Sequence, residues 1–186
     1  MAALEAIGLV ELASIGVGVK IEDAMLKAAP VELLVARTIC SGKYIIVVAG
    51  EVSAVRASVD AGVALGEDAL IEERVIPQVH PSVFPAIGLS VALPDEPVEA
   101  LGVVETFSAS SIIEAADAAA KAASITLFRV HLAMAVGGKG FLLMTGEVAA
   151  VEAAVEAAAA VAAADGILVS KQVIPGPRPE LLQEFI

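Results

Sequence analysis

The sequence predicts two tandem α+β domains, each with a ferredoxin-like βαββαβ order that builds a four-stranded antiparallel sheet with two helices on one face. Three observations lead to this fold class. The 186-residue chain repeats itself, each half alternates β-rich runs with helical patterns, and 58% of its residues are hydrophobic but only 3% aromatic. The cores must therefore be built from Val, Ile, Leu and Ala, and a chain of this length is long enough to bury them.

The repeat is visible as matched segments in the same order. AIGLVELASI is matched by ALGVVETFSA, SGKYIIVVAGEV by GGKGFLLMTGEV, and both copies end in Val-Ile-Pro. The offset between the copies is 94 from Glu11 to Glu105 and 98 from Pro77 to Pro175, so short insertions separate matched elements. Loops absorb such length changes, which is typical of a duplicated domain. We expect the domains at 1–90 and 91–186, with a linker around 81–99.

The elements follow in order from local patterns. In the first copy we expect strands at 7–12, 33–39, 44–49 and 69–76 and helices at 21–29 and 51–65. In the second copy we expect strands at 101–107, 126–133, 141–145 and 166–174 and helices at 112–123 and 147–164. Glu22 and Asp23 would lie in the first turn of their helix, where the helix dipole favours negative charge. Residues 40–43 form a loop short enough for a hairpin.

Charge and hydropathy exclude two classes of partner. The net charge of −12 and a pI near 4.5 argue against nucleic-acid binding, which needs clustered Lys and Arg. The mean hydropathy of +0.87 raises the question of a membrane span, but the uncharged stretch 75–93 contains Pro77, Pro81 and Pro85. Prolines at these positions make a continuous apolar helix implausible. With no secretory signal at the N-terminus, we expect a cytoplasmic protein without a membrane partner.

The sequence lacks complete motifs for phosphate or dinucleotide binding. SGKY and GGKG resemble the end of a phosphate-binding loop, but Arg37 and Ala133 stand where its first glycine is required. Gly16 and Gly18 lack the third glycine of a dinucleotide fingerprint, so we expect them to connect a strand to a helix.

Isolated charged and imidazole side chains have structural explanations as well. His80 and His131 lack metal-ligand spacing, and we expect structural roles for both. Glu51 and Glu147 open helices and are expected to cap them. No reactive constellation of residues remains, so we expect a protein that is not an enzyme.

The repeated segments resemble the bacterial microcompartment shell domain, present twice over almost the whole chain. The residues that carry the resemblance are IGLVELASI, EDAMLKAAPVELL, SGKYIIVVAGEV and their echoes LGVVET, AADAAAKAA and GGKGFLLMTGEV. Among tandem-domain shell proteins, ARTICSGK, VHPSVFPAI and FRVHLAMAVGGKG are most similar to the iron–sulfur trimeric type of the propanediol-utilisation microcompartment.

The resemblance implies a homotrimer whose six domains imitate a hexagonal tile, a pseudohexamer. Such tiles would meet each other and other microcompartment shell proteins in the shell, a cytoplasmic structure around encapsulated enzymes. Lys27 and Lys121 match the family's lysine at tile edges. The pore loops that line the central axis would be 38–42 and 133–138, with Thr38, Ile39, Ser41, Gly42, Ala135, Val136, Gly137 and Gly138. Gln78 and Gly176 depart from the family pattern, which has an arginine after the Ile-Pro pair, so edge contacts are expected to be weaker or differently built.

Three-fold symmetry would turn the single cysteine, Cys40, into three thiols around one axis. The resemblance implies one 4Fe-4S cluster per trimer held by these thiolates, with electron transfer across the shell to or from encapsulated redox enzymes. Three thiolates leave one iron of such a cluster open to another ligand, and a zinc site with three thiolates and water is chemically possible too. The alternatives are a plain metabolite-pore tile without a cluster, and a soluble enzyme or small-ligand sensor on a duplicated scaffold.

Overall fold

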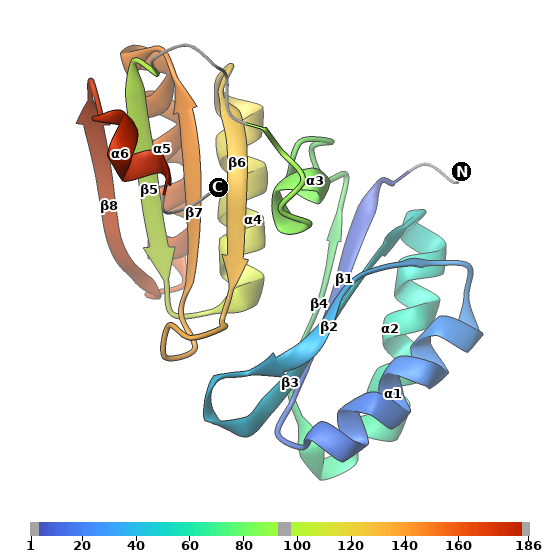
Figure 1. The fold of residues 1–186 in the computed structure, drawn as a ribbon. Helices are drawn as coiled ribbons and strands as arrows, with labels where there is room; N and C mark the ends of the chain where they lie inside the picture. Colours follow the sequence, from blue (N-terminus) through green and yellow to red (C-terminus); the bar gives the residue numbers. More distant parts are fainter. Residues whose placement is uncertain (1–3, 93–97, 184–186) are drawn as a thin grey trace. The chain divides into compact units, whose positions relative to one another are not determined.

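A computed structural model describes residues 4–92 and 98–183, and the chain divides into two compact units, 1–81 and 82–186. The two units repeat one architecture, which confirms the predicted fold class (Figure 1). The division falls inside the expected linker but earlier than residue 90, because residues 82–90 include a short helix that packs within the second unit. None of the described helices has the length and apolarity that crossing a bilayer requires.

The first unit is a four-stranded antiparallel sheet in the order β2-β3-β1-β4, with two helices on one face. Its elements are β1 (Ala6–Leu12), α1 (Ile15–Ala28), β2 (Glu32–Ile39), β3 (Lys43–Gly50), α2 (Val52–Gly66) and β4 (Leu70–Pro77). The core lies between the sheet and the helices, where Ile21 and Met25 of α1 and Val55 and Val59 of α2 pack on Val48 and its neighbours. Val55 and Val59 are four residues apart and both are buried, as expected for one face of a helix that packs on the sheet.

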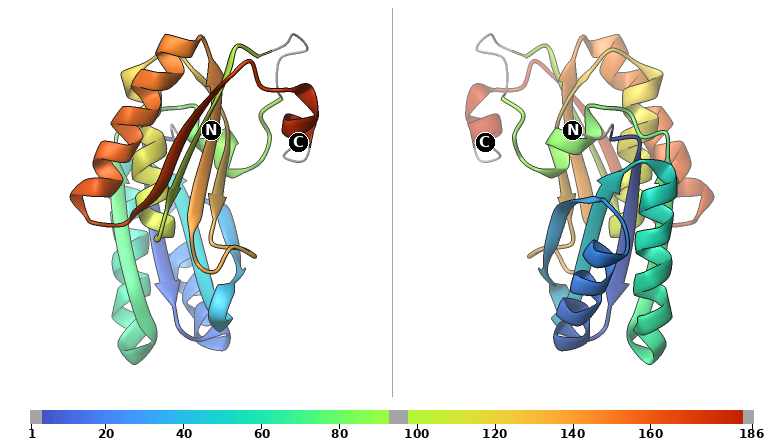
Figure 2. Two further views of the ribbon diagram at one scale, coloured as in Figure 1. Left: turned by 90° about the vertical axis from the view of Figure 1, so that its left-hand side faces the viewer. Right: turned by 90° about the vertical axis from the view of Figure 1, so that its right-hand side faces the viewer.

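The second unit repeats this arrangement in the order β6-β7-β5-β8. Its elements are α3 (Val83–Ile87), β5 (Ala100–Thr106), α4 (Ala109–Ala122), β6 (Thr126–Leu132), β7 (Gly140–Gly146), α5 (Val148–Ala164), β8 (Leu168–Pro175) and α6 (Pro179–Gln183). Helix α6 lies on the face of this sheet opposite α4 and α5, as Figure 2 shows. Neither α3 nor α6 is among the predicted elements.

The two sheets have register shifts at matching positions of the repeat. In the first sheet the register shifts between Glu11 and Leu12, and in the second sheet it shifts between Glu105 and Thr106. The edge strands β2 and β6 show a second matched pair of irregularities, at 33–35 and 127–129. Because bulges re-aim side chains and persist in related folds, their repetition supports the same ancestry as the sequence repeat.

The predicted starts of the first helix in each copy are wrong. Helix α1 begins at Ile15 rather than at 21, and α4 begins at Ala109 rather than at 112. The side chain of Ser14 accepts a hydrogen bond from the Val17 N–H, so a serine cap starts the helix early. Glu22 and Asp23 consequently lie in mid-helix rather than in the first turn. Gly16 and Gly18 are helical residues, not a connection between a strand and a helix.

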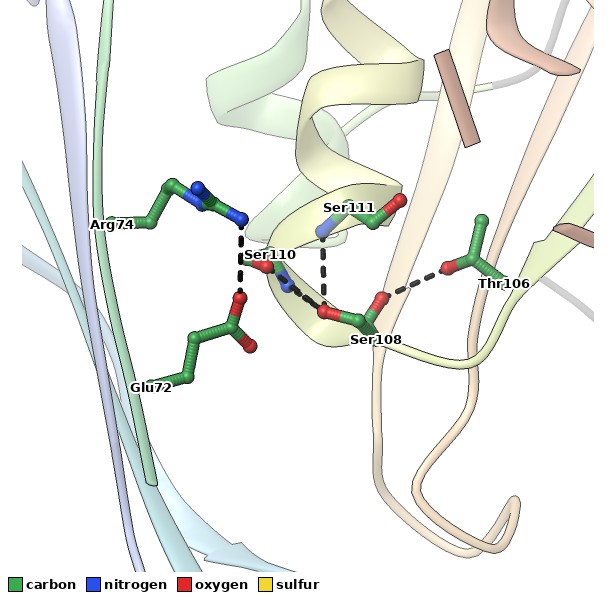
Figure 3. A network of polar contacts seen from close by, with 6 residues as sticks. All are labelled: Glu72, Arg74, Thr106, Ser108, Ser110 and Ser111. Atoms are coloured by element: carbon green, nitrogen blue, oxygen red, sulfur yellow. Dashed lines mark hydrogen bonds and ion pairs between the residues drawn. The ribbon is translucent and has the colours of Figure 1, made fainter. Parts of the chain in front are cut away.

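The cap of α4 is the more elaborate of the two (Figure 3). Ser108 Oγ accepts hydrogen bonds from the backbone N–H groups of Ser110 and Ser111, and the Thr106 hydroxyl donates to the Ser108 carbonyl at 2.8 Å. These bonds satisfy N–H groups that have no partner inside the helix. The strand β5 is thereby joined to α4 by a turn of fixed geometry.

Candidate functional site

Cys40 lies at the turn of the β2–β3 hairpin, as the sequence predicts. The turn is formed by Cys40–Gly42, and the last strand pair before it is Ile39 with Lys43. Ser41 and Gly42 both have positive φ, 65° and 73°, a conformation that glycine adopts readily and serine at some cost. The Cys40 side chain is half-buried, and a Cβ added to Gly42 would meet no atom within 4 Å. The half-buried thiol therefore lies on a tight turn, and there is open space beside the backbone of Gly42, two residues later.

The matching loop of the second unit joins β6 to β7 and has no cysteine. Its backbone closes with a bond of 3.1 Å from the Ala133 N–H to the Lys139 carbonyl, at the position of the Ile39–Lys43 pair. This turn has five residues, whereas the turn of the first unit has three. Met134 stands at the position that corresponds to Cys40 in the repeat. Positive φ angles occur at Ala133, Ala135, Gly137 and Gly138.

The predicted pore-loop residues lie on these two turns, except that Thr38 and Ile39 are the last two residues of β2 and pair with β3. Thr38, Ser41, Gly42, Ala135 and Gly137 are exposed, Val136 and Gly138 are half-buried, and Ile39 is buried. The pore assignment itself concerns an assembly and stays a prediction.

His131 stiffens the base of the second loop. Its Nε2 lies 2.6 Å from the Met134 carbonyl oxygen, and its ring stacks on Phe141 with centroids 4.6 Å apart. The side chain is buried between these partners. A structural role, as expected from the sequence, accounts for these contacts.

An ion pair that was not predicted from the sequence joins the end of each turn to a central strand of its sheet, β1 in the first unit and β5 in the second. Lys43 Nζ lies 2.6 Å from Glu11 Oε1, and Lys139 Nζ lies 2.5 Å from Glu105 Oε1. The Glu11 side chain is only 8% exposed, so its charge depends on this partner more than a surface carboxylate would. The signal was available, because both acids and both lysines recur in the repeat at matched positions.

The two predicted edge lysines occupy the last turns of α1 and α4. Lys27 pairs with Asp23, and Lys121 pairs with Asp117, both at 2.6 Å and both four residues apart on one helix. A cation in the last turn also complements the helix dipole. Lys27 remains 73% exposed in its pair, so it is free to reach a neighbour.

Gln78 and Gly176, the departures from the arginine pattern, share one backbone conformation. Their φ angles are 54° and 55°, and each directly follows the last residue of β4 or β8. The Gly176 N–H donates to the Glu99 carbonyl at 2.7 Å, and the next residue after Gln78, Val79, donates to the Glu5 carbonyl at 2.9 Å. The segment after Val-Ile-Pro is therefore anchored to the start of its repeat in both units.

In the part of the chain that the structure describes, no group of three or more His, Cys, Asp or Glu residues suited to a metal ion occurs. Cys40 is the sole cysteine of the sequence. Any multi-thiolate site would need several copies of the turn.

Comparison with known proteins agrees with the duplicated architecture. The BMC domain family matches twice, at residues 6–79 and 100–177. The chain is 42% identical over 183 residues to the bacterial microcompartment shell protein PduT of Citrobacter freundii, covering 98% of both chains. It is 43% identical over 88 residues to the shell protein EutM of Salmonella typhimurium, covering 47% of this chain and 90% of EutM.

Solved structures extend the likeness to three dimensions. The crystal structure of a microcompartment protein from Desulfitobacterium hafniense shares 45% identity and a TM-score of 0.93, covering 97% of this chain and 99% of that one. A fused permuted hexameric shell protein from the RMM microcompartment shares 26% identity and a TM-score of 0.61, covering 86% of this chain and 82% of that one. The chain belongs to the bacterial microcompartment shell proteins and is a tandem tile protein that carries the shell domain twice.

Proposed function

We propose that three copies of the chain close into a flat pseudohexameric shell tile and that their three Cys40 thiolates hold one 4Fe-4S cluster on the three-fold axis. The observation that carries this proposal is the position of Cys40. The sole cysteine lies on one of two duplicated hairpin turns, and the other turn is longer and lacks a thiol. A ring of three chains would then alternate cysteine turns with cysteine-free turns, which gives three equivalent thiols.

The trimer is supported by two apolar surfaces that the chain leaves open. On α1, Val19 is 53% exposed. On the second sheet, Val103 and Phe141 line an apolar groove of about 290 Å³. One chain thus carries two different open apolar surfaces. Contacts between unlike surfaces of identical chains generate rings when the rotation closes.

The donor set suits an iron–sulfur cluster. Such clusters are held by cysteine thiolates, and three protein thiolates leave one iron site for another ligand. Ser41 and Gly42 are small and exposed, and open space lies beside the Gly42 backbone, so bulky side chains do not crowd the turn. The ion pair of Lys43 with Glu11 holds the end of β3 and thereby the orientation of the turn.

A bound cluster would supply one-electron transfer, and in this position it would relay electrons across the shell. The protein's own role would be to position the Cys40 thiolates. The hairpin register places Cys40 directly after the last residue of β2, at the turn. Enzymes encapsulated in the shell and other shell proteins are the proposed partners.

Anaerobic purification with ample iron and sulfide tests the cluster. The wild type is expected to be brown, with iron and acid-labile sulfide in proportion to trimers. Cys40→Ser is expected to lose both while the trimer persists in light scattering, because a hydroxyl is a poorer ligand for iron than a thiolate. The control is Met134→Ser, which alters the corresponding exposed position of the other turn and is expected to retain the cluster.

Two results would reject parts of the proposal. A colourless wild type, or a serine variant with the same cluster spectrum, rejects the iron–sulfur assignment and leaves a plain metabolite-pore tile. Metal analysis of the colourless protein would detect zinc if three thiolates bind it instead. A wild type that stays monomeric across the working concentration range rejects the tile assembly and the shared site together.

A further inference from the structure

Helices α3 and α6 are counterparts in the repeat. Each follows the last strand of its copy, and Val83 follows Pro77 by the same number of residues as Leu181 follows Pro175. Within the second unit, α3 packs against β6 and α4. Four of its five residues are buried there, namely Val83, Phe84, Ala86 and Ile87. A short apolar helix after Val-Ile-Pro thus covers the edge strand and first helix of a shell domain.

The corresponding surface of the first unit is open. Leu33 on β2 is 38% exposed, whereas its counterpart Leu127 on β6 is 1% exposed. On α1, Ile15, Val19 and Leu26 are exposed at helical spacing and form one stripe. We refer to Ile15, Val19, Leu26 and Leu33 as the α1–β2 face. Among the described residues of the first unit, no short helix covers this face as α3 covers its counterpart.

Helix α6 has two adjacent leucines, of which one is buried within the second unit and the other is exposed. Leu182 is buried against Leu101 and Leu143 of its own sheet, which fixes the helix in place. The adjacent Leu181 is 40% exposed and lies with Ile174 at the rim of the groove of about 290 Å³. An anchored helix with an exposed leucine can bind a partner without much loss of conformational freedom.

We infer that the α1–β2 face binds α6 and the adjacent groove rim of a second copy of this chain. Both surfaces are apolar, and the second unit shows the same pairing of a short helix with the same elements. Exposed apolar patches of this kind mark protein interaction sites. The inference rests on the proposed trimer and assigns its contact, because each chain would offer the α1–β2 face to one neighbour and α6 to the other.

Two variants change opposite sides of the contact. Val19→Asp and Leu181→Asp each place a charge on a side chain that is exposed in the single chain, so folding should be preserved. Each is expected to weaken the trimer at least about tenfold, measured as the concentration at which it dissociates in mass photometry. Leu65→Asp is the matched control, since Leu65 is about as exposed but lies at the end of α2. It is expected to leave the trimer unchanged.

A photo-cross-link identifies the contact directly. A benzophenone amino acid at position 19 is expected to cross-link to residues 174–183 of another chain, as mapped by mass spectrometry. If the wild type is trimeric but both aspartate variants stay trimeric at the same concentrations, or the cross-link maps elsewhere, the inference is overturned and the trimer stands. A monomeric wild type overturns both. Circular dichroism of each variant separates a lost contact from a lost fold.

Discussion

The ring of Tyr44 fills the space beside Gly18, so that a Cβ built on Gly18 would lie 2.6 Å from the Tyr44 Cδ1 atom. The second repeat reverses this relation. Ile112 stands at the position of Gly18, Gly140 stands at that of Tyr44, and a Cβ on Gly140 would lie 2.6 Å from Ile112 Cγ2. In the first unit the side chain of Tyr44, on a strand, fills this helix–strand contact. In the second unit the side chain of Ile112, on a helix, fills it. Close packing at this contact is achieved in the two units with opposite choices of large and small residues.

Gly18→Ala is expected to destabilise the protein although alanine is the better helix former. Overpacking of a rigid contact costs about 1–3 kcal/mol, which outweighs the helix-propensity gain of roughly 1 kcal/mol. The control is Gly16→Ala, because a Cβ there would meet nothing within 4 Å. Urea unfolding should lower the midpoint for Gly18→Ala and raise it slightly for Gly16→Ala. Equal gains in both variants would contradict the close contact.

Tyr44 also predicts an alkaline stability transition. Its hydroxyl donates to Glu22 Oε2 at 2.8 Å. Burial, followed by the hydrogen bond to Glu22 and the charge of that carboxylate, raises the pKa of Tyr44 from 10.0 to about 12. The neutral phenol is thus favoured in the folded chain, so its stabilisation is complete below pH 10 and is lost as the pH rises toward 12.

The chain has one tyrosine and no tryptophan, so tyrosinate absorbance reports on Tyr44 alone. Tyrosinate absorbance should titrate late in the native protein and near the ordinary value in urea. Tyr44→Phe should cost about 1 kcal/mol at neutral pH, the net worth of a typical hydrogen bond, and should remove the loss of stability specific to this pH window. A native titration at the ordinary pKa of 10.0 would reject the hydrogen bond from Tyr44 to Glu22.

The order of elements could be predicted because strand runs and helical spacing are local signals that the repeat supplies twice. The start of α1 could not be read in the same way. Gly16 and Gly18 look like helix breakers, yet Ser14 caps the helix before them and the Tyr44 ring requires a glycine at position 18. That requirement comes from a strand distant in sequence. Tertiary packing therefore overrides the local preference.

The candidate site was predictable in part for the same reason. Placing Cys40 on a hairpin turn needed only the two flanking strand patterns. The Glu11–Lys43 pair was missed because Glu11 lies inside an apolar strand and its partner is 32 positions away. Helices α3 and α6 were missed because the segments after Val-Ile-Pro contain prolines, yet Pro85 lies inside α3 and Pro179 starts α6. Short helices tolerate proline in their first turn.

Lys43→Met is expected to destabilise the first unit by roughly 2 kcal/mol, because it removes the cation from a largely buried carboxylate. Glu11→Gln in the same chain should restore part of the loss, since a neutral amide needs no counter-charge. The comparison is Asp23→Asn, which breaks an exposed pair and should cost less than about 0.5 kcal/mol. Urea midpoints report all three. If Lys43→Met were as mild as Asp23→Asn, the pair would not fasten the turn.

The last prediction concerns Lys27 and Lys121, which the family resemblance assigns to tile edges. Replacing both by alanine is expected to abolish extended sheets in electron microscopy while trimers persist in light scattering. The fold should barely change, because each lysine lies at a helix end and its pair with the aspartate four residues earlier contributes about 0.2–0.5 kcal/mol.

The aspartates provide the matched control for this variant. Asp23→Asn with Asp117→Asn breaks the same two pairs but keeps both cations, so sheets should still form. Sheets that are lost in both double variants would trace the defect to the helix ends rather than to lysine contacts. Unchanged sheets in the double alanine variant would reject the edge assignment. The lateral contact would then have to be sought elsewhere, first at Gln78 and Gly176, where the chain departs from the family's arginine and turns with positive φ.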